Sequence, residues 1–428
     1  MFKRISKSLA LVCAFISITA CGFFAKPEPT PTPAPPVTLK YVSFNALAGI
    51  EEPLLKQFET DHPNIQIQQQ GFRLNTRQYL SDTPPDIITA APGALLDQAI
   101  SDGLVTDITD IWQQADFANN YPANLRALSE KDGKQYMLPI GYNWNAIYYN
   151  KQVFAQYNLQ PPKTWDEFTQ LCDTLLVNGV TPLSLSGRNA FMASLWIDYL
   201  DLRLNGADFH RQLMAGEIPY NDARVQAMFA RWREMVTKGY FLEDSQNLQN
   251  LNSLTALVRG DNGKLSGQKA AMALTGPFFL TDLPEPFRKE LDFFPFPTMD
   301  PGIPTSEVVF AIGYVIPAKA EHRQEALNFL TYLGSDKAQA LLSQNATSGV
   351  YAPAHVGDTK TLPAITQQGM QLVANAKSVG TPYFIGVSQK VQFEIGNALP
   401  QLLLDSRSSE TFDLDKMLSR LEQARQAK

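Results

Sequence analysis

The sequence predicts an α/β protein with two domains. Segments with strand character alternate with segments of helical periodicity, a pattern typical of parallel sheets covered by helices. The chain has 428 residues, more than the roughly 250–300 residues that one hydrophobic core usually supports. The net charge is −6, with no basic run after the N-terminal stretch. Nucleic-acid binding therefore has no electrostatic support.

The first part of the chain shows the alternation clearly. Apolar side chains at Leu54, Leu55 and Phe58 share one helical face, whereas NIQIQQQ alternates with the period of a strand. Glycine ends the second helix near Gly103. The elements predicted here are, in order, a strand (37–45), a helix (51–63), two strands (64–70 and 84–93) and a helix (94–103).

The later part continues in the same style. Thr164 and Glu167 form the pattern of a capping box at a helix start. Residues 222–239 carry apolar side chains at helical spacing and stop at Gly239, so we interpret these side chains as core. Residues 325–342 predict two short helices broken at Gly334.

The N-terminus predicts export. A short basic stretch, MFKRISK, precedes an apolar stretch, SLALVCAFISITA, and then Cys21. This stretch is shorter than the roughly 20 residues that span a bilayer, and the charge order is typical of a signal peptide. The sequence ITAC resembles the bacterial lipoprotein box, in which Cys21 is lipidated. We therefore expect a lipoprotein signal peptide at 1–20, and the alternative is an ordinary signal with an incidental cysteine.

A proline-rich linker follows the predicted anchor. More than half of residues 26–36, KPEPTPTPAPP, are proline. Such a segment favours extended polyproline II, and at about 3.1 Å per residue it spans some 30 Å. We expect residues 21–36 to tether a globular body to a membrane surface. Cys172 is then the one cysteine left within the folded part, and its place on an apolar helical face predicts a buried, inert thiol.

No catalytic or metal-binding motif stands out. The four histidines are scattered and none has metal-ligand spacing to Cys, Asp or Glu. The loop 260–267, GDNGKLSG, lacks the spacing of a phosphate-binding loop, and no G-x-S-x-G elbow occurs. We expect no metal, no cofactor and no catalytic residues. A pair of glycosidase carboxylates stays open, because Asp and Glu together number 42.

Residues 139–151, PIGYNWNAIYYNK, combine four aromatic residues with three asparagines. Aromatic residues favour strands, so a buried strand is one interpretation. A ligand platform is the other, because a sugar ring presents an apolar face and a rim of hydroxyls. Asparagine both donates and accepts hydrogen bonds and suits such a rim. On one extended strand, Tyr142, Trp144 and Tyr148 would point one way and Asn143 and Asn145 the other.

An ordered set of segments resembles the extracellular solute-binding proteins of carbohydrate ABC transporters, a family that includes maltose-binding protein. The set includes PPDIITAAPG, DGKQYMLPIGYNWNAIYYNK, PPKTWDEF, GVTPLSLSG, AMALTGPF and YAPAH, and the likeness covers about residues 37–360. The resemblance implies two α/β lobes of the periplasmic-binding-protein type, joined by hinge segments with a ligand cleft between them. Lobe one would be 37–140 plus 300–335, and lobe two 141–298 plus 336–428.

The resemblance also implies a function. The protein would be a lipid-anchored, monomeric receptor in the cell envelope, with its globular part in the periplasm or outside the cell. It would capture a sugar or oligosaccharide and deliver it to an ABC permease. Two alternatives stay open: a secreted glycan-active enzyme, and the same fold binding a non-sugar such as a polyamine or a phosphate ester.

Residue by residue, the resemblance places several side chains at the cleft. Asn143 stands where the family carries a sugar-contacting carboxylate, with Trp144 beside it, and Phe278 stands where a sugar-stacking tryptophan follows Gly-Pro. An aromatic surface of Trp144 and Phe278 is expected. Tyr148, Tyr149 and the other four tryptophans are assigned to the core. The remaining ligand-binding candidates are Phe44, Asn45, Ala91, Arg188, Phe191, Tyr351 and Tyr383.

Overall fold

The computed structural model describes residues 35–44, 48–72, 80, 84–258, 269–281, 283–345, 352–353, 360, 362–405 and 413–427. Pro36–Lys428 form one compact unit, and this unit is the part treated below. Predictions about the signal peptide, Cys21, most of the linker, Asn45 and Tyr351 fall outside the described residues. No helix in the described part is long and apolar enough to cross a membrane.

A seven-stranded sheet forms the centre of the first lobe. Its order is β12-β6-β11-β3-β1-β2, with β13 pairing β11. β1 runs parallel to β2 and β3, whereas β11 runs antiparallel to β3 and β6. The alternation predicted for NIQIQQQ is present in the first half of β2, because Ile65 is buried and Ile67 half-buried whereas Gln66 and Gln68 are exposed. The strands are β1 Val37–Phe44, β2 Ile65–Phe72, β3 Ile87–Ala90, β6 Leu138–Trp144, β11 Ser306–Val315, β12 Ala352–Pro353 and β13 Ser378–Gly380.

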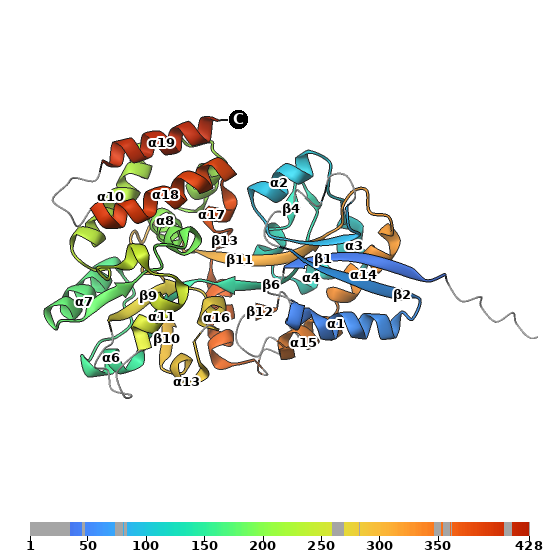
Figure 1. Ribbon diagram of the computed structural model, residues 1–428, viewed down its shortest axis with the longest axis horizontal. Helices are drawn as coiled ribbons and strands as arrows, with labels where there is room; N and C mark the ends of the chain where they lie inside the picture. Colours follow the sequence, from blue (N-terminus) through green and yellow to red (C-terminus); the bar gives the residue numbers. More distant parts are fainter. Residues whose placement is uncertain are drawn as a thin grey trace, which may run out of the picture. The chain divides into compact units, whose positions relative to one another are not determined.

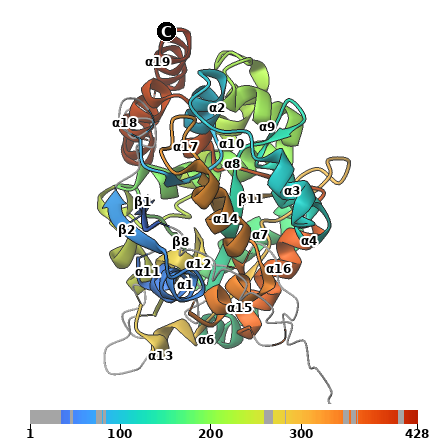
Figure 2. The same cartoon turned by 90° about the vertical axis from the view of Figure 1, so that its right-hand side faces the viewer.

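Helices pack against this sheet and share one hydrophobic core with it. α1, α14 and α15 contact one another, and Figure 2 shows them side by side. The helices are α1 Ala48–Asp61, α2 Ala94–Ser101, α3 Thr109–Gln114, α4 Phe117–Asn120, α5 Ala123–Ala127, α14 Arg323–Leu333, α15 Asp336–Asn345 and α16 Ala364–Asn375, with a small hairpin of β4 Glu130–Lys131 and β5 Lys134–Gln135. The break predicted at Gly334 is confirmed, since this residue caps α14.

A four-stranded sheet of order β10-β7-β9-β8 forms the centre of the second lobe. Its strands are β7 Ala146–Asn150, β8 Thr181–Ser184, β9 Ala270–Thr275 and β10 Leu291–Phe294. The helical elements of this part are α6 Lys151–Gln156, α7 Trp165–Val177, α8 Ala190–Leu204, α9 Ala207–Met214, α10 Ala223–Thr237, the 3-10 turn η3 Ser245–Asn247, α11 Asn250–Val258, α12 Pro277–Leu280, α13 Glu285–Arg288, α17 Tyr383–Gly386, α18 Gln389–Asp405 and α19 Leu414–Gln426.

Several predictions about local structure and the core are confirmed. The capping box is complete. The Thr164 hydroxyl oxygen accepts from the Glu167 backbone N–H, and the Glu167 carboxylate accepts from the Thr164 backbone N–H. Cys172 is buried, and burial raises the pKa of its thiol well above the ordinary range. The four tryptophans assigned to the core are buried, as is Tyr148: Trp112, Trp165, Trp196 and Trp232.

Three segments connect the lobes. β6 and β7 are consecutive in the chain but belong to different sheets, and Asn145 lies between them. β11 pairs with β6 from Val309 onwards, and its first residues pair with β13 instead. The third segment runs through β13 into α17, which contacts α8. In Figure 1, β6 and β11 cross the middle of the view between the two groups of elements.

Two expectations need correction. The aromatic segment 139–151 is two strands broken at Asn145, because its halves pair with different sheets. Residues 336–375 were expected in lobe two, yet α15 contacts α1 and α16 contacts β6 and β11. Their buried residues Ala338, Leu342 and Val373 belong to the core of the first lobe. The chain therefore returns to the second lobe later than the resemblance implied, in the segment that holds β13.

Candidate functional site

The pairing of β6 with β11 separates two faces at the crossing. Asn143 lies opposite Phe310, and Trp144 lies opposite Val309. Residues paired directly across neighbouring strands point to the same face, and successive residues point to opposite faces. Asn143 and Phe310 therefore share one face of the sheet, and Trp144 lies on the other.

Four phenylalanines gather on the Asn143 side. The ring of Phe191 lies 5.9 Å from that of Phe310 and 6.1 Å from that of Phe279, measured between centroids, and Phe278 lies 5.3 Å from Phe279. All four side chains are half-buried, whereas most of their chain neighbours are buried. The phenylalanine cluster (Phe191, Phe278, Phe279 and Phe310) thus draws on α8, α12 and β11, that is, on both lobes.

Local structure explains why these rings meet. Asn189 caps α8, because its side chain accepts a hydrogen bond from the Met192 backbone, and this fixes Phe191 in the first turn. α12 begins directly after Gly276, with Pro277 in its first turn. A Cβ at Gly276 would lie only 3.0 Å from the Trp144 carbonyl oxygen. The glycine therefore lets α12 approach the crossing segment closely and brings Phe278 to it.

Asn143 has hydrogen-bonding capacity that the described residues leave unused. The residue is 3% exposed, and neither its amide nitrogen nor its amide oxygen has a partner among the described residues. Asn145 differs, since its Nδ2 donates to the Val308 carbonyl oxygen at 3.1 Å. A buried amide without a partner costs about 1–3 kcal/mol. The two neighbouring asparagines therefore have different roles, and Asn143 is the one suited to bind a polar ligand.

Trp144 is a correction to the expected site. It is fully buried, and its ring lies 6.0 Å from that of Phe293. A Cβ at Gly369 would lie 2.1 Å from the indole, so α16 covers this face directly. The expected aromatic surface of Trp144 and Phe278 does not form, because the two side chains lie on different sides of the crossing.

Tyr383 is also corrected. It is fully buried in the second lobe, and its hydroxyl forms a hydrogen bond with that of Tyr220. Its backbone N–H donates to Asp198 Oδ1 at 2.7 Å. This residue belongs to the core of the lobe, because its side chain is fully buried and both its hydroxyl and its backbone N–H form hydrogen bonds within that lobe.

The other predicted residues have mixed outcomes. Arg188 is exposed just before the cap of α8, and Ala91 is half-buried at the end of β3. Phe44 ends β1, but its side chain is outside the description, as are Asn45 and Tyr351. Sequence reasoning missed Phe279 and Phe310. Phe279 follows Phe278 directly, whereas Phe310 lies within the apolar run EVVFAIGYV and gave no separate signal.

A cavity of about 770 Å³, referred to below as the larger cavity, lies at another place between the lobes. It is bordered by α2 and the β4 strand of the first lobe and by α9, α17 and Arg425 of the second. Its lining includes Pro92 and Gly93 but none of the phenylalanine cluster and not Asn143. Volume alone would favour this cavity, but two of its cations are already engaged: Arg425 pairs with Glu422, and the Lys131 ammonium donates to the Ser101 hydroxyl. We therefore favour the phenylalanine cluster.

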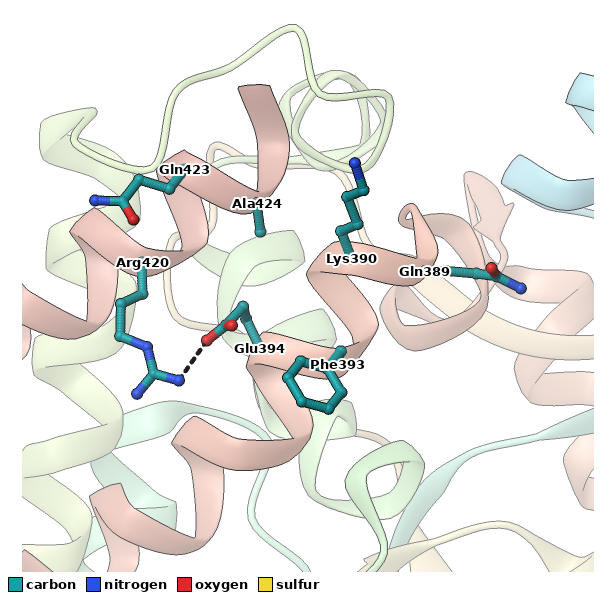
Figure 3. Close-up of a pocket in the computed structure, with 7 residues that line it drawn as sticks. All are labelled: Gln389, Lys390, Phe393, Glu394, Arg420, Gln423 and Ala424. Carbon is teal, nitrogen blue, oxygen red and sulfur yellow. Dashed lines mark ion pairs between the residues drawn. The ribbon is translucent and has the colours of Figure 1, made fainter. Parts of the chain in front are cut away.

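A groove on the second lobe is of a different kind. Figure 3 shows the side chains of α18 and α19 that line it, and among them Glu394 and Arg420 point toward each other and form an ion pair. Every residue that lines it comes from these two helices. The groove is therefore a surface feature of one lobe, and it lacks the contribution from two lobes that the phenylalanine cluster has.

Comparison with known proteins identifies the family. The pattern of the bacterial extracellular solute-binding proteins matches residues 42–340. The chain belongs to this family. It is 26% identical to an uncharacterised ABC transporter extracellular-binding protein of Pyrococcus horikoshii, over 96% of this chain and 99% of that one. It is also 26% identical to the multiple sugar-binding protein of Streptococcus mutans, over 71% and 72%.

Solved structures support the same fold. The bacterial solute receptor AcbH, described as having an exclusive preference for β-D-galactopyranose, matches with a TM-score of 0.78 at 22% identity, over 91% of this chain and 96% of that one. RafE in complex with raffinose matches with a TM-score of 0.65 at 17% identity, over 90% and 98%. At these identities the likeness concerns the fold. The two-lobed α/β architecture expected for this solute-binding protein is confirmed.

Proposed function

We propose that this solute-binding protein captures a sugar or oligosaccharide at the phenylalanine cluster and delivers it to an ABC permease. One observation carries the proposal: the buried Asn143 amide, which has no hydrogen-bond partner among the described residues, shares a face with half-buried phenylalanine rings from both lobes. A ring face accepts the apolar side of a pyranose, and the amide both donates to and accepts from its hydroxyls. Relatives named for sugar binding support the same substrate class.

The ligand set extends to residues that the resemblance placed at the cleft. Phe191 and Phe278 supply ring faces, whereas Arg188 and Ala91 are included because the resemblance places them at the cleft. Phe44, Asn45 and Tyr351 complete the proposed set, on the resemblance alone. The larger cavity bordered by α2 and α9 is the competing position for a ligand.

A binding panel tests the proposal. Purified protein is titrated calorimetrically with galactose, raffinose, xylo-oligosaccharides and chito-oligosaccharides, and with spermidine and glycerol phosphate as non-sugar probes. We expect at least one sugar to bind, and to bind more weakly to Asn143→Ala than to wild type. Arg211→Ala, which alters the larger cavity, serves as the matched control and leaves that affinity unchanged. Binding that only Arg211→Ala weakens would move the site to the larger cavity.

We further propose that the protein is a receptor without catalysis. The support is membership of a solute-binding family together with the site chemistry, in which amides and phenyl rings dominate. Every sugar in the panel is therefore recovered intact after prolonged incubation, as measured by mass spectrometry. Protein-dependent hydrolysis of any of them would promote the alternative of a glycan-active enzyme.

We also propose a monomeric protein that is anchored by lipid at Cys21 in the cell envelope. The support is the ITAC sequence with the proline-rich linker behind it. Wild type expressed in a bacterial host partitions with membranes, whereas Cys21→Ser stays unlipidated by mass spectrometry. Identical fractionation of both as soluble, unmodified protein would leave an ordinary signal peptide as the explanation.

A further inference from the structure

The C-terminal half of α8 carries a set of buried polar side chains with unusual targets. Asp198, Tyr199 and Arg203 are at most 3% exposed, and each forms hydrogen bonds outside its own helix. Buried polar and charged groups are costly unless they are paired. Their partners therefore indicate what this helix holds in place.

The first target is the segment between β6 and β7. The Tyr199 hydroxyl lies 2.7 Å from the carbonyl oxygen of Asn145, to which it donates. The Asn145 side chain in turn donates to Val308 on β11, at 3.1 Å. Two crossing segments are thus joined to each other and to α8 at one place.

The second target is the start of β11. Arg203 Nη1 donates to the Ser306 carbonyl oxygen at 2.5 Å, and Nη2 pairs with Glu307 Oε1 at 2.7 Å. Glu307 Oε2 lies 3.0 Å from the same Tyr199 hydroxyl, whose single proton is shared between Oε2 and the Asn145 carbonyl oxygen. Both ends of the Glu307 carboxylate are therefore held by α8, and the ion pair is fully enclosed.

The third target is the segment after β13. Asp198 Oδ1 accepts the backbone N–H of Tyr383, at the start of α17. His210 lies between Asp198 and Asp201, at 3.1 and 2.7 Å, and so fixes the Asp198 carboxylate. β13 itself pairs with Ser306–Val308, the part of β11 that Arg203 holds.

The opposite ends of the same segments are held by the first lobe. Trp144 and Val309 are still paired within the seven-stranded sheet, one residue away from Asn145 and Val308. In the third segment, α16 packs on β6 and β11 and ends at Asn375, whereas Lys377 already donates to Thr305 next to β11. In each segment, contacts with the first lobe therefore give way to contacts with the second lobe within one or two residues.

We infer that α8 is the fixed point of the hinge: it holds all three crossing segments to the second lobe, and the lobes pivot at Trp144–Asn145, at Val308–Val309 and between Asn375 and Lys377. Hinges are a few residues that absorb a large backbone change between rigid parts. Tyr199 and Arg203 are then positioning residues. Asn145 is the hinge residue nearest to Asn143, and it therefore determines where Asn143 lies relative to the second lobe. The inference depends on the two-lobed fold and not on the identity of the ligand.

Distance measurements in ligand-free protein test this. Nitroxide labels are placed at Gln113→Cys in α3 and Val177→Cys in α7, both exposed, in the full chain with Cys13→Ala and Cys21→Ala. Cys172 stays unlabelled because it is buried. Pulsed dipolar spectroscopy then gives the distribution of distances between the lobes. We expect Tyr199→Phe to broaden and shift this distribution relative to the unsubstituted chain.

The chain offers a matched control. Tyr41 in the first lobe is equally buried, and its hydroxyl donates to the buried Glu51 carboxylate at 2.6 Å. Its ring contacts Tyr314, in the part of β11 that the first lobe holds and away from the Val308–Val309 pivot. Tyr41→Phe removes the same group and lowers the melting temperature, and the distance distribution stays as it was. If Tyr199→Phe and Tyr41→Phe give the same distribution, the inference is overturned.

A second variant keeps the test decisive if Tyr199→Phe does not fold. Asn145→Ala removes the side-chain bond to Val308 and leaves the backbone carbonyl for Tyr199. It too is expected to broaden the distribution, and an unchanged distribution in this folded variant would equally reject the hinge assignment. Because no ligand is added, failure here is distinguishable from failure of the proposed sugar binding.

Discussion

The two faces of the β6–β11 pair carry similar types of side chain but have different surroundings. On one face, Asn143 and Phe310 adjoin half-buried phenylalanines, and the Asn143 amide has no partner among the described residues. On the other face, Trp144 is fully buried beneath α16 and next to Phe293. Aromatic and amide side chains occur on both, so residue type alone does not mark a site. What separates the faces is which of them a helix covers.

The largest effect should come from the covered face. Removal of a buried tryptophan leaves a cavity, and Trp144→Ala is expected to cost about 3–5 kcal/mol of unfolding free energy. Urea denaturation of ligand-free protein measures this. Sugar affinity of the fraction that stays folded is expected to change little. A stable variant that has lost sugar binding would instead return Trp144 to the site.

Tyr383, like Trp144, belongs to the core and not to the site. It is bonded to Asp198, which also contacts His210, so the pKa of His210 offers a test of this buried cluster. Burial disfavours the charged His210 ring, but Asp198 and Asp201 more than offset this and raise its pKa to about 9, from 6.5. A raised pKa means that the folded state holds the proton more tightly. The stabilisation is thus complete below about pH 6.5 and is lost as the pH rises towards 9, by about 3 kcal/mol.

Thermal melts at pH 6 and pH 9 measure this difference. Wild type is expected to lose melting temperature between the two values, and His210→Asn to lose much less. Equal losses in both proteins would mean that this cluster does not hold the proton that its geometry implies.

Much of the fold could be predicted because it follows from local pattern. Helix ends are set by short-range chemistry, as at the Thr164 capping box and at Gly334, and the resemblance supplied the two lobes. The position of α16 could not be predicted. It depends on Gly369, whose missing side chain admits the Trp144 indole, and no periodicity in the sequence reports a contact between positions so far apart.

The candidate site was predicted only in part, because its residues come from segments that are far apart in the sequence. Asn143, Phe191 and Phe278 were named from the resemblance, and the structure brings the two phenylalanines together with Phe279 and Phe310. Trp144 was named with them because a strand pattern assigns residues to faces but does not say which face is later covered. Phe310 was missed since its neighbours in β11 are apolar and buried, so only the pairing with Asn143 distinguishes it.

The open face predicts a contrast between two neighbouring asparagines. Asn143→Ala removes an amide that a sugar hydroxyl would use, and a buried hydrogen bond lost to truncation costs about 1–3 kcal/mol, roughly tenfold or more in affinity. Its ligand-free stability is expected to stay the same or rise slightly. Asn145→Ala gives the contrast in stability alone, because it breaks the bond to Val308 and lowers ligand-free stability. Calorimetric titration and a thermal melt of each variant separate the two, and an unaltered affinity in Asn143→Ala would argue against its role.

The smallest effect belongs to Phe278, a ring on the open face, and Phe293 on the covered face is its control. Phe278 is half-buried beside Phe279, whereas Phe293 is buried beside Trp144. Stacking on one aromatic ring contributes on the order of 1 kcal/mol beyond area burial, so Phe278→Ala should weaken sugar binding about fivefold. Its ligand-free melting temperature should fall only slightly, since a half-exposed ring leaves little cavity. Phe293→Ala should do the reverse, with a loss of about 3–5 kcal/mol in stability and an unaltered affinity. If Phe278→Ala destabilises the ligand-free protein as strongly as Phe293→Ala does and leaves sugar affinity intact, then Phe278 belongs to the core. The open face would then retain Asn143, Phe191, Phe279 and Phe310 as its proposed ligand contacts.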